Sequence, residues 1–279
     1  TARHRSDVVC NILKTLQPGT FITDLGCGAG QLAQRMAEIG HTVSAFDQSE
    51  KMIQLANEQK ASLPTEIADR ISFSVADIDN VPADLPPQDA VTCMGVLGYL
   101  ETDAQLFKPA VEALKPGGLF LVSTRNRLFN VVSFSHRTIS EIDGGNAGRR
   151  VDEITRLSTP ITREQVKHIA ENLILSGQAI LESLKSPESP EPADAAPVGT
   201  TAIEARQHTP MEIVEQGRRH GLEMVSLHGV HPHLMQPHLN QLMPANTYNI
   251  LSSVLEPLHD HPASLAWSSV IVAVFKKPA

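Results

Sequence analysis

Strand and helix signals alternate along residues 21–124, and this alternation restricts the fold more than any other feature of the sequence. Short apolar runs typical of buried strands lie at 21–25, 42–46, 71–76, 90–94 and 119–124. Helical patterns separate these runs, at 32–39, 51–60 and 102–114. Because parallel neighbours are joined through helical crossovers, the alternation predicts an α/β fold with a doubly wound, mostly parallel sheet.

Two more strands are expected near the end of the chain. Thr209 and Pro210 form a cap and first-turn pair that is typical of a helix start, and Gly221 ends the predicted helix. Strands are then predicted at 222–228 and 267–275. They bring the predicted sheet to seven strands.

The pattern divides the chain into three parts. Residues 1–124 are expected to form the ligand-binding α/β core, and 125–208 a mainly helical insertion that serves as a lid over a small substrate. A proline-rich loop is expected at 186–199. Residues 209–279 supply the two closing strands, with an excursion at 231–262 that includes a helix near 247–258.

Composition excludes several classes of protein. The formal net charge is −8 and the basic residues are scattered, which disfavours a nucleic-acid partner. No apolar run reaches the roughly 18 residues of a membrane span, so no membrane partner is expected. The three cysteines, Cys10, Cys27 and Cys93, are far apart and form no C-x-x-C pair. They predict reduced thiols, no thiolate metal site and a cytoplasmic location.

A glycine-rich turn follows the first predicted strand. It reads Asp24-Leu-Gly26-Cys-Gly28-Ala-Gly30 and leads into a helix, where backbone N–H groups are unpaired and a ligand can approach closely. The dinucleotide fingerprint requires glycine where Gln31 stands, and no Lys-Ser/Thr pair follows as in a phosphate loop. Both phosphate-binding interpretations therefore fail.

Two carboxylates at later strand ends favour a nucleoside ligand. Asp47 closes the second strand, where an acidic side chain accepts hydrogen bonds from both ribose hydroxyls. Asp77 ends the third strand and is suited to an exocyclic amine, and Ile78 offers an apolar surface to a base. Taken singly, each residue has a structural explanation: Asp47 could be a carboxylate near a helix N-terminus, and the glycines could serve the turn alone.

The ordered set of motifs resembles the class I S-adenosylmethionine-dependent methyltransferase family. The matching stretches are 24–30, 46–52, 75–78, 89–95 and 114–118, in the family's order and spacing. The resemblance covers about residues 5–124 and the two closing strands. It implies the Rossmann-like methyltransferase fold, with S-adenosylmethionine as cofactor and S-adenosylhomocysteine as product.

The resemblance also implies roles for individual residues. The glycines would pass the methionine moiety, Asp24 and the Met94 carbonyl would lie near its amino group, and Asp47 would hold the ribose. Gln48 and Met52 would flank the adenosine, and Asp77 with Ile78 would contact the adenine. Gly28, Asp47 and Asp77 are expected to line a common cavity. The implied cofactor-binding residues are Asp24, Gly26, Cys27, Gly28, Gly30, Asp47, Gln48, Met52, Asp77, Ile78 and Met94.

The acceptor side is predicted from strand ends four to six. The run after strand four, which ends at Tyr99, lacks the (Asn/Asp)-Pro-Pro-(Tyr/Phe) motif of nucleobase methylation and so argues against DNA. The predicted substrate-binding residues are Tyr99, Arg125, Asn126 and His228. An arginine at this edge, Arg125 or Arg127, suits a carboxylate or phosphate. His231 or His233 is the candidate base, because a histidine titrates near pH 6.5. No carboxylate partner is evident for a metal on this H-x-H pair, and no metal is predicted.

These features predict methyl transfer to an oxygen or nitrogen atom of a small-molecule acceptor, which is the expected partner. Two alternatives stay open. One is a cofactor-binding protein without methyl transfer, either regulatory or resembling aminopropyl transferases, and the other is a protein or RNA methyltransferase. The sequence leaves the oligomeric state open.

Overall fold

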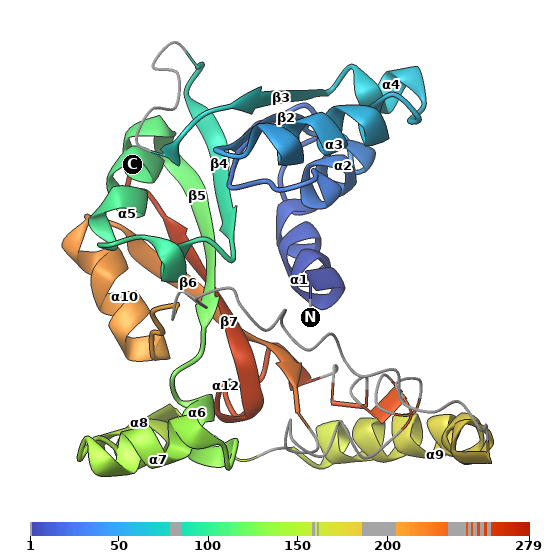
Figure 1. The fold of residues 1–279 in the computed structure, drawn as a ribbon, viewed down its shortest axis with the longest axis vertical. Helices are drawn as coiled ribbons and strands as arrows, with labels where there is room; N and C mark the ends of the chain where they lie inside the picture. Colours follow the sequence, from blue (N-terminus) through green and yellow to red (C-terminus); the bar gives the residue numbers. More distant parts are fainter. Residues whose placement is uncertain are drawn as a thin grey trace. The chain divides into compact units, whose positions relative to one another are not determined.

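The computed structural model forms two compact units (Figure 1). The first comprises Thr1–Arg125, Met211–Ser226 and Val272–Ala279, and the second Asn126–Pro210 and Leu227–Ile271. The structure describes residues 2–78, 85–157, 160, 162–185, 205–233, 244, 247, 250–251, 254–255 and 258–279.

The described residues form a seven-stranded sheet with the order β3-β2-β1-β4-β5-β7-β6. Strands β1 to β5 pair in parallel along this order. The doubly wound, mostly parallel sheet expected from the sequence is therefore confirmed. The strands are β1 (Phe21–Leu25), β2 (Thr42–Asp47), β3 (Ile71–Val75), β4 (Gln88–Met94), β5 (Leu114–Arg125), β6 (Glu223–Pro232) and β7 (Ser268–Lys276).

Strand β7 runs antiparallel to β5. The backbone N–H of Lys277 donates to the Gly118 carbonyl over 2.9 Å, and that of Asn126 donates to the Ser269 carbonyl over 2.9 Å. The residue numbers on the β7 side fall from 277 to 269 while those on the β5 side rise from 118 to 126. This is the pattern of an antiparallel pair. The sheet is thus mixed, with its parallel part running from β3 to β5.

The strand order reverses between β1 and β4. The chain winds outward from β1 through β2 to β3 and then crosses to β4 on the other side of β1. In open α/β sheets, ligands bind beyond the carboxyl ends of the strands at such a switch point. The ends of β1 and β4 are Leu25 and Met94, so the residues that follow Leu25 and surround Met94 are the ones to inspect.

Helices cover the sheet of the first unit. Figure 1 shows α1, α2 and α3 to one side of it and α5 and α10 to the other. Helix α2 shows why: its buried residues, Leu32, Ala33, Met36 and Ala37, form one apolar stripe at helical spacing. These helices are α1 (Ala2–Leu13), α2 (Gln31–Glu38), α3 (Glu50–Lys60), α4 (Thr65–Ala68), the 3-10 turn η2 (Leu97–Tyr99), α5 (Ala104–Ala113) and α10 (Pro210–Arg219).

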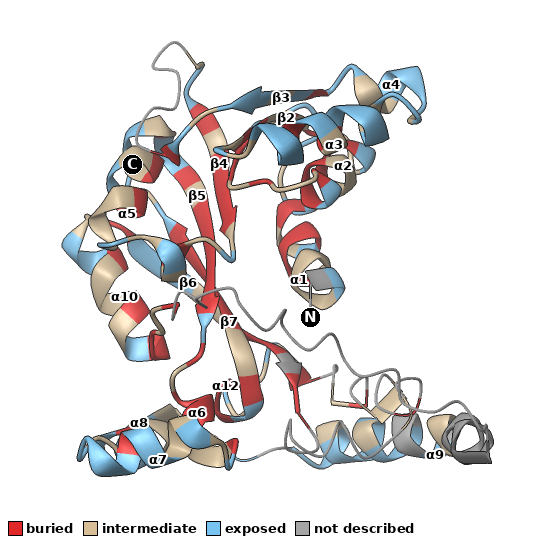
Figure 2. Cartoon of the chain, in the orientation of Figure 1, coloured by how far each residue is buried: buried red, intermediate tan, exposed pale blue. Residues whose placement is uncertain are grey.

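Aromatic packing joins α5 and α10 to the sheet. The rings of Phe107, Phe120 and Phe275 are fully buried, with centroids 5.3 to 6.3 Å apart. A Cβ on Gly217 of α10 would lie 2.2 Å from Phe275, so only glycine allows α10 to approach this closely. Figure 2 shows the buried residues concentrated along the strands, as expected for a sheet covered on both faces.

Strand β5 begins earlier than the strand predicted at 119–124. The strand begins at Leu114, and its pairing with β4 shifts register after Gln88. Gly117 has a φ of +80°, yet its N–H donates to the Lys277 carbonyl over 2.8 Å. These turn-forming residues bulge within the strand because β7 on the other side supplies hydrogen-bond partners.

The second unit contains the helical insertion. Its helices are α6 (Phe129–Val132), α7 (His136–Asp143), α8 (Ala147–Leu157), α9 (Arg163–Lys185) and α12 (Ser264–Trp267). A capping box formed by Ser135 and Thr138 begins α7. The loop expected at 186–199 lies outside the described residues, and so does much of the 231–262 excursion with its predicted helix at 247–258.

Two further expectations concern membranes and thiols. In the described part of the chain, no helix has both the length and the apolar character that crossing a bilayer requires. Cys10, Cys27 and Cys93 are all free and buried.

Candidate active site

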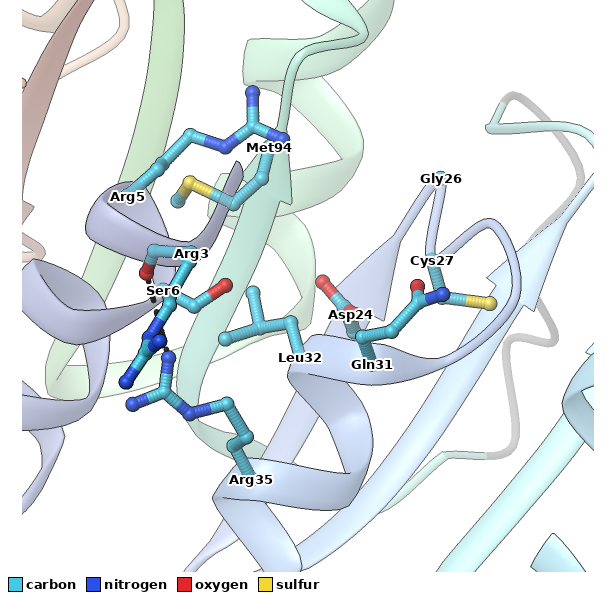
Figure 3. A pocket seen from close by; sticks show the side chains of 10 residues that line it. All are labelled: Arg3, Arg5, Ser6, Asp24, Gly26, Cys27, Gln31, Leu32, Arg35 and Met94. Carbon is cyan, nitrogen blue, oxygen red and sulfur yellow. Dashed lines mark hydrogen bonds between the residues drawn. The ribbon is translucent and has the colours of Figure 1, made fainter. Parts of the chain in front are cut away.

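Two adjoining hollows lie at the switch point of the first unit, and both are lined by Gly26 and Met94. The first, drawn in Figure 3, has a volume of about 450 Å³ and is lined by Arg3, Arg5, Ser6, Asp24, Gly26, Cys27, Gln31, Leu32, Arg35 and Met94. The second has a volume of about 440 Å³ and is lined by Leu25, Gly26, Phe46, Asp47, Gln48, Ala76, Asp77, Ile78, Met94, Gly95, Val96, Tyr99, Leu100, Glu101 and Gln105.

The glycines of the turn after β1 allow its backbone to pack directly against side chains of neighbouring segments. Gly26 has a φ of +71°, and a Cβ there would lie 2.2 Å from Cγ2 of Val96. Gly30 has a φ of +84° at the N-cap of α2, and its Cβ would lie 2.5 Å from the Phe73 ring. Both positions therefore require glycine for two reasons, the left-handed backbone and the absence of space.

Gly28 acts through a hydrogen bond. Its N–H donates to Oδ2 of Asp47 over 2.8 Å, while the Ser49 N–H donates to Oδ1 over 2.9 Å. Two backbone donors thus hold the Asp47 carboxylate at the end of β2. Gly28 is not among the lining residues of either hollow, and Gly26 is the glycine found beside the cavity of Asp47 and Asp77.

Asp24 is a buried acid with one unused oxygen. Its side chain is 2% exposed, and its Oδ1 accepts a 2.6 Å hydrogen bond from the Thr92 hydroxyl. Its Oδ2 has no hydrogen-bond partner among the described residues. Burial raises the pKa of Asp24 to about 7, although Thr92 and Arg5 act in the opposite direction. A buried acceptor left unpaired is costly, so this oxygen is suited to a cationic ligand group.

Arg5 is a site residue that the sequence motifs did not reveal. It comes from α1, which begins well before the first glycine, and it lines the same hollow as Asp24 and Met94 (Figure 3). A Cβ on Gly95 would lie 2.8 Å from Nη1 of Arg5, so the guanidinium packs against the backbone after β4. Burial lowers the pKa of Arg5, and the charge of Asp24 opposes that shift. The pair places a cation and an anion in one hollow.

The second hollow gathers the predicted nucleoside contacts. Asp47, Gln48, Asp77 and Ile78 all line it, although they end or follow two different strands. Asp77 is exposed and Ile78 is buried, so the hollow offers both a polar and an apolar wall. Glu101 and Gln105 also line it and were not predicted.

The structure places Tyr99 beside the nucleoside residues and Met52 outside the lining of both hollows. Tyr99, predicted on the acceptor side, is 58% exposed and lines the second hollow with the nucleoside residues. Met52 is 39% exposed, is not among the lining residues of either hollow, and donates its N–H to the Ser49 hydroxyl as part of the α3 cap.

Asn126 has a structural role in the second unit. Its side chain is buried, and its amide donates to the carbonyls of Leu265 and Ser268. Its Oδ1 accepts from the Leu128 N–H over 3.1 Å. Both amide donors are therefore used inside the protein, which the sequence-based expectation of a substrate contact did not anticipate. Arg125, the last residue of β5, is exposed.

The histidines of the second unit have distinct surroundings. His228 is buried, and its Nδ1 lies 2.5 Å from Oδ1 of Asp260. Burial lowers the pKa of His228, and Asp260 opposes this shift. His233 is also buried, bonds the Ser269 hydroxyl over 3.0 Å and stacks on Phe129. The side chain of His231 lies outside the described residues. No cluster of three or more metal-ligating side chains occurs in the part of the chain that the structure describes.

Comparisons with known proteins identify a methyltransferase domain in this chain. Residues 22–118 match the family model described as "Methyltransferase domain". A stretch of 111 residues is 32% identical to the ubiquinone biosynthesis O-methyltransferase of Xanthomonas campestris pv. campestris (strain B100), covering 39% of this chain and 45% of that protein. The chain thus spans about half the length of the curated relatives it matches.

Solved structures show the same fold at low sequence identity. A methyltransferase in complex with the Haloferax volcanii Trm112 activator aligns with a TM-score of 0.56 at 17% identity, over 100% of this chain and 92% of that one. Magnesium protoporphyrin IX methyltransferase from Synechocystis PCC 6803, solved with bound S-adenosylhomocysteine, aligns with a TM-score of 0.55 at 14% identity, over 98% and 83%.

The strand order β3-β2-β1-β4-β5-β7-β6, with β7 antiparallel, is that of the Rossmann-like methyltransferase fold. Residues 22–118 match a methyltransferase domain of the class I S-adenosylmethionine-dependent methyltransferase family.

Proposed function

We propose that this protein transfers the methyl group of S-adenosylmethionine to an oxygen or nitrogen atom of a small-molecule acceptor by in-line substitution. One observation carries the proposal. Two hollows meet at Gly26 and Met94, and the charged groups in them complement the two ends of this cofactor. The methionine end carries an ammonium and a carboxylate, and the nucleoside end carries ribose hydroxyls and an amine.

The first hollow fits the methionine end. Asp24 would accept from the ammonium through its unpaired Oδ2, with the Met94 carbonyl beside it. Arg5 would donate to the carboxylate, because a guanidinium and a carboxylate form two parallel hydrogen bonds. Gly26, Cys27 and the turn as far as Gly30 would form the wall along the methionine chain.

The second hollow fits the nucleoside end. Asp47, held by the N–H groups of Gly28 and Ser49, would accept from the ribose hydroxyls. Asp77 would accept from the adenine amine, and Ile78 would pack against the ring. Gln48 would flank the adenosine, with Met52 supporting it from α3.

The chain's contribution to the reaction is mainly positional. When bound, the cofactor supplies an electrophilic methyl carbon on a sulfonium sulfur. The residues of both hollows would fix that carbon relative to the acceptor, and alignment of this kind corresponds to effective molarities on the order of 10⁵ M. A buried carboxylate or unprotonated amine acceptor would need nothing more than this alignment and exclusion of water.

A hydroxyl acceptor would also need a base, which contributes about 10²–10⁴-fold. We propose His231 or His233 for this role, with His228, Tyr99 and Arg125 contacting the acceptor. The short contact between His228 and Asp260 makes His228 a second candidate base, since a carboxylate orients the ring and stabilises its protonated form. The Xanthomonas relative is an O-methyltransferase, which supports an oxygen acceptor.

Isothermal titration of the intact chain with S-adenosylhomocysteine tests the cofactor assignment. Asp47→Ala should weaken binding by about tenfold or more, because it removes charge-assisted hydrogen bonds to the ribose. Asp69→Ala removes an exposed acid that lines neither hollow and is the matched control. A folded chain that does not bind the ligand would refute the proposal.

Incubation with methyl-labelled cofactor and a panel of small hydroxyl and amine compounds tests the reaction. Label that appears in a small-molecule product supports the proposal. Cofactor binding with no labelled product across the panel, or label found only in added RNA or protein, would instead favour one of the alternative functions.

A further inference from the structure

The neighbouring strands β1 and β4 place a buried hydroxyl beside the carboxylate of Asp24. Asp24 and Thr92 are register partners in this parallel pair, so their side chains lie on the same face of the sheet. Thr92 is fully buried, and its hydroxyl donates to Oδ1 of Asp24 over 2.6 Å. A second contact, with the Thr23 carbonyl, is 3.5 Å long and therefore weak. The Thr92 hydroxyl thus serves mainly the Asp24 carboxylate.

The two oxygens of Asp24 have different surroundings. Oδ1 is bound by Thr92, whereas Oδ2 has no hydrogen-bond partner among the described residues. Figure 3 shows the Asp24 side chain among the residues that line the first hollow. Because the hydrogen bond holds Oδ1 toward β4, Oδ2 is the oxygen left for a ligand. A carboxylate fixed in this way loses less rotational freedom when a ligand binds it.

The same hydrogen bond decides where Asp24 carries a proton. Oδ1 accepts from the Thr92 hydroxyl, as the carbonyl oxygen of a carboxylic acid would, so a protonated Asp24 has its proton on Oδ2. An ammonium ligand needs that same oxygen as an acceptor. Proton and ammonium therefore compete for Oδ2, and a group that favours the ionised form of Asp24 also favours the ligand.

The ionisable groups that face Asp24 come from four segments: Arg5 of α1, Cys27 of the glycine turn, Asp47 of β2 and Cys93 of β4. Burial raises the pKa of Asp24 to about 7, and Asp47 acts in the same direction. The Thr92 hydrogen bond lowers this pKa, and it does so more than the charge of Arg5. Burial raises the pKa of both thiols, so they stay uncharged. Thr92 is thus the strongest group that favours the ionised carboxylate.

We propose that Thr92 is a positioning residue for Asp24: its hydroxyl orients the carboxylate and keeps it ionised, so that Oδ2 accepts a hydrogen bond from the ammonium group of a ligand. That this ligand is S-adenosylmethionine rests on the proposed function, whereas the effect of Thr92 on Asp24 does not. Thr92 lies within the strand predicted at 90–94, but only its register with β1 brings it to Asp24.

An NMR titration of the ligand-free chain tests the effect on Asp24. The carboxyl carbons of ¹³C-labelled aspartates are followed from about pH 4 to pH 10, and Asp24→Asn identifies the Asp24 signal. Thr92→Val and Thr92→Ala both remove the hydroxyl and should raise the pKa of Asp24 above that of the parent. Thr92→Ser keeps a hydroxyl and should return this pKa toward the parent value. A shift in Thr92→Ser as large as that in Thr92→Val would overturn the inference.

Thr23→Val is the matched control for these variants. Thr23 is 1% exposed and precedes Asp24 on β1, so its side chain lies on the opposite face of the sheet. Its hydroxyl has no hydrogen-bond partner among the described residues. The substitution therefore removes a buried hydroxyl without changing the surroundings of Oδ1. The inference is also overturned if Thr92→Val and Thr92→Ala leave the pKa of Asp24 where Thr23→Val leaves it.

Calorimetry with S-adenosylhomocysteine on the same proteins tests the link to the ligand. Thr92→Val should bind about tenfold more weakly than Thr23→Val near pH 7, because it loses a hydrogen bond to a charged group. The ratio of the two Kd values should narrow as the pH rises, since both carboxyls are then ionised. Equal affinities near pH 7 would overturn this link.

The two titrations separate this inference from the proposed function. A raised Asp24 pKa in Thr92→Val, with no binding by the parent, supports the effect of Thr92 and removes the proposed function. Binding by the parent, with an unchanged Asp24 pKa in Thr92→Val, removes this inference alone.

Discussion

The backbone N–H of Gly28 donates a 2.8 Å hydrogen bond to Oδ2 of Asp47, so the glycine turn after β1 directly fixes the carboxylate at the end of β2. The glycine turn and Asp47 are separate in the sequence, but a hydrogen bond joins them in the fold. The turn supplies the donor, and the neighbouring strand supplies the acceptor that faces the second hollow.

Gly26→Ala should destabilise the protein and abolish cofactor binding. The new methyl group would lie 2.2 Å from Val96, and the residue would keep a φ of +71°. The combined clash and strain should lower the free energy of unfolding by about 1–3 kcal/mol, measured by urea denaturation. Gly19→Ala is the control for strain alone, because Gly19 has a φ of +85° with no neighbour within 4 Å. An equal loss in both variants would contradict the role of the Val96 contact.

Asp24 should make stability fall as pH rises. Its pKa is raised by burial from 3.8 to about 7, so the folded state holds a proton that the unfolded state has lost between those values. Unfolding then becomes progressively easier from about pH 4 to pH 7 and levels off above pH 7. Denaturation across this range, compared with Asp24→Asn, measures the effect. A stability difference between the two proteins that does not vary with pH would contradict it.

Cofactor binding should release a proton from Asp24 below pH 7. An ammonium beside the unpaired Oδ2 favours the ionised carboxylate, so affinity for S-adenosylhomocysteine should rise with pH up to about 7. Calorimetry at pH 6 in buffers of different ionisation enthalpy counts the released protons. Asp24→Asn should bind without this release, and an unchanged proton count in that variant would assign the release to another group.

Asn126→Ala should destabilise the second unit without weakening cofactor binding. The substitution leaves the carbonyls of Leu265 and Ser268 without the amide donors they now share. Loss of buried hydrogen bonds of this kind lowers the free energy of unfolding by roughly 1–3 kcal/mol. Asn57→Ala, which removes an amide from an exposed position of α3, is the control. Wild-type stability in Asn126→Ala would show that its hydrogen bonds are dispensable.

Asp260→Asn should lower the pKa of His228 further. Burial already lowers this pKa, and Asp260 is the group that opposes the shift. The histidine Cε1–H signal in a proton NMR titration reports the pKa, with Asp143→Asn as an exposed-acid control on α7. If His228 is the base, the acidic limb of the activity profile moves to lower pH by the same amount. An unmoved His228 signal would show that the short contact is electrostatically unimportant.

The parallel core was predictable because its signals are local. The runs at 21–25, 42–46 and 71–76 lie in sequence where β1, β2 and β3 lie in the structure, since buried strands need a short apolar run and turns need glycine. The glycine motif and Asp47 mark strand ends, and in a parallel sheet those ends meet at one edge. The order of these motifs along the chain was therefore sufficient to predict that they lie at the same edge of the sheet.

Other parts of the site arise from contacts between distant segments. Arg5 enters from α1 with no motif around it, and Asp260 reaches His228 from 32 positions away. Asn126 follows a strand, as a substrate contact would, but carbonyls more than 130 residues later use its amide. The sequence alone determined the alternation, the glycine turn and the carboxylates at the strand ends, because these follow from neighbouring residues. Only the tertiary structure decided which buried polar groups find partners and which, like Oδ2 of Asp24, are left for a ligand, because that depends on long-range packing.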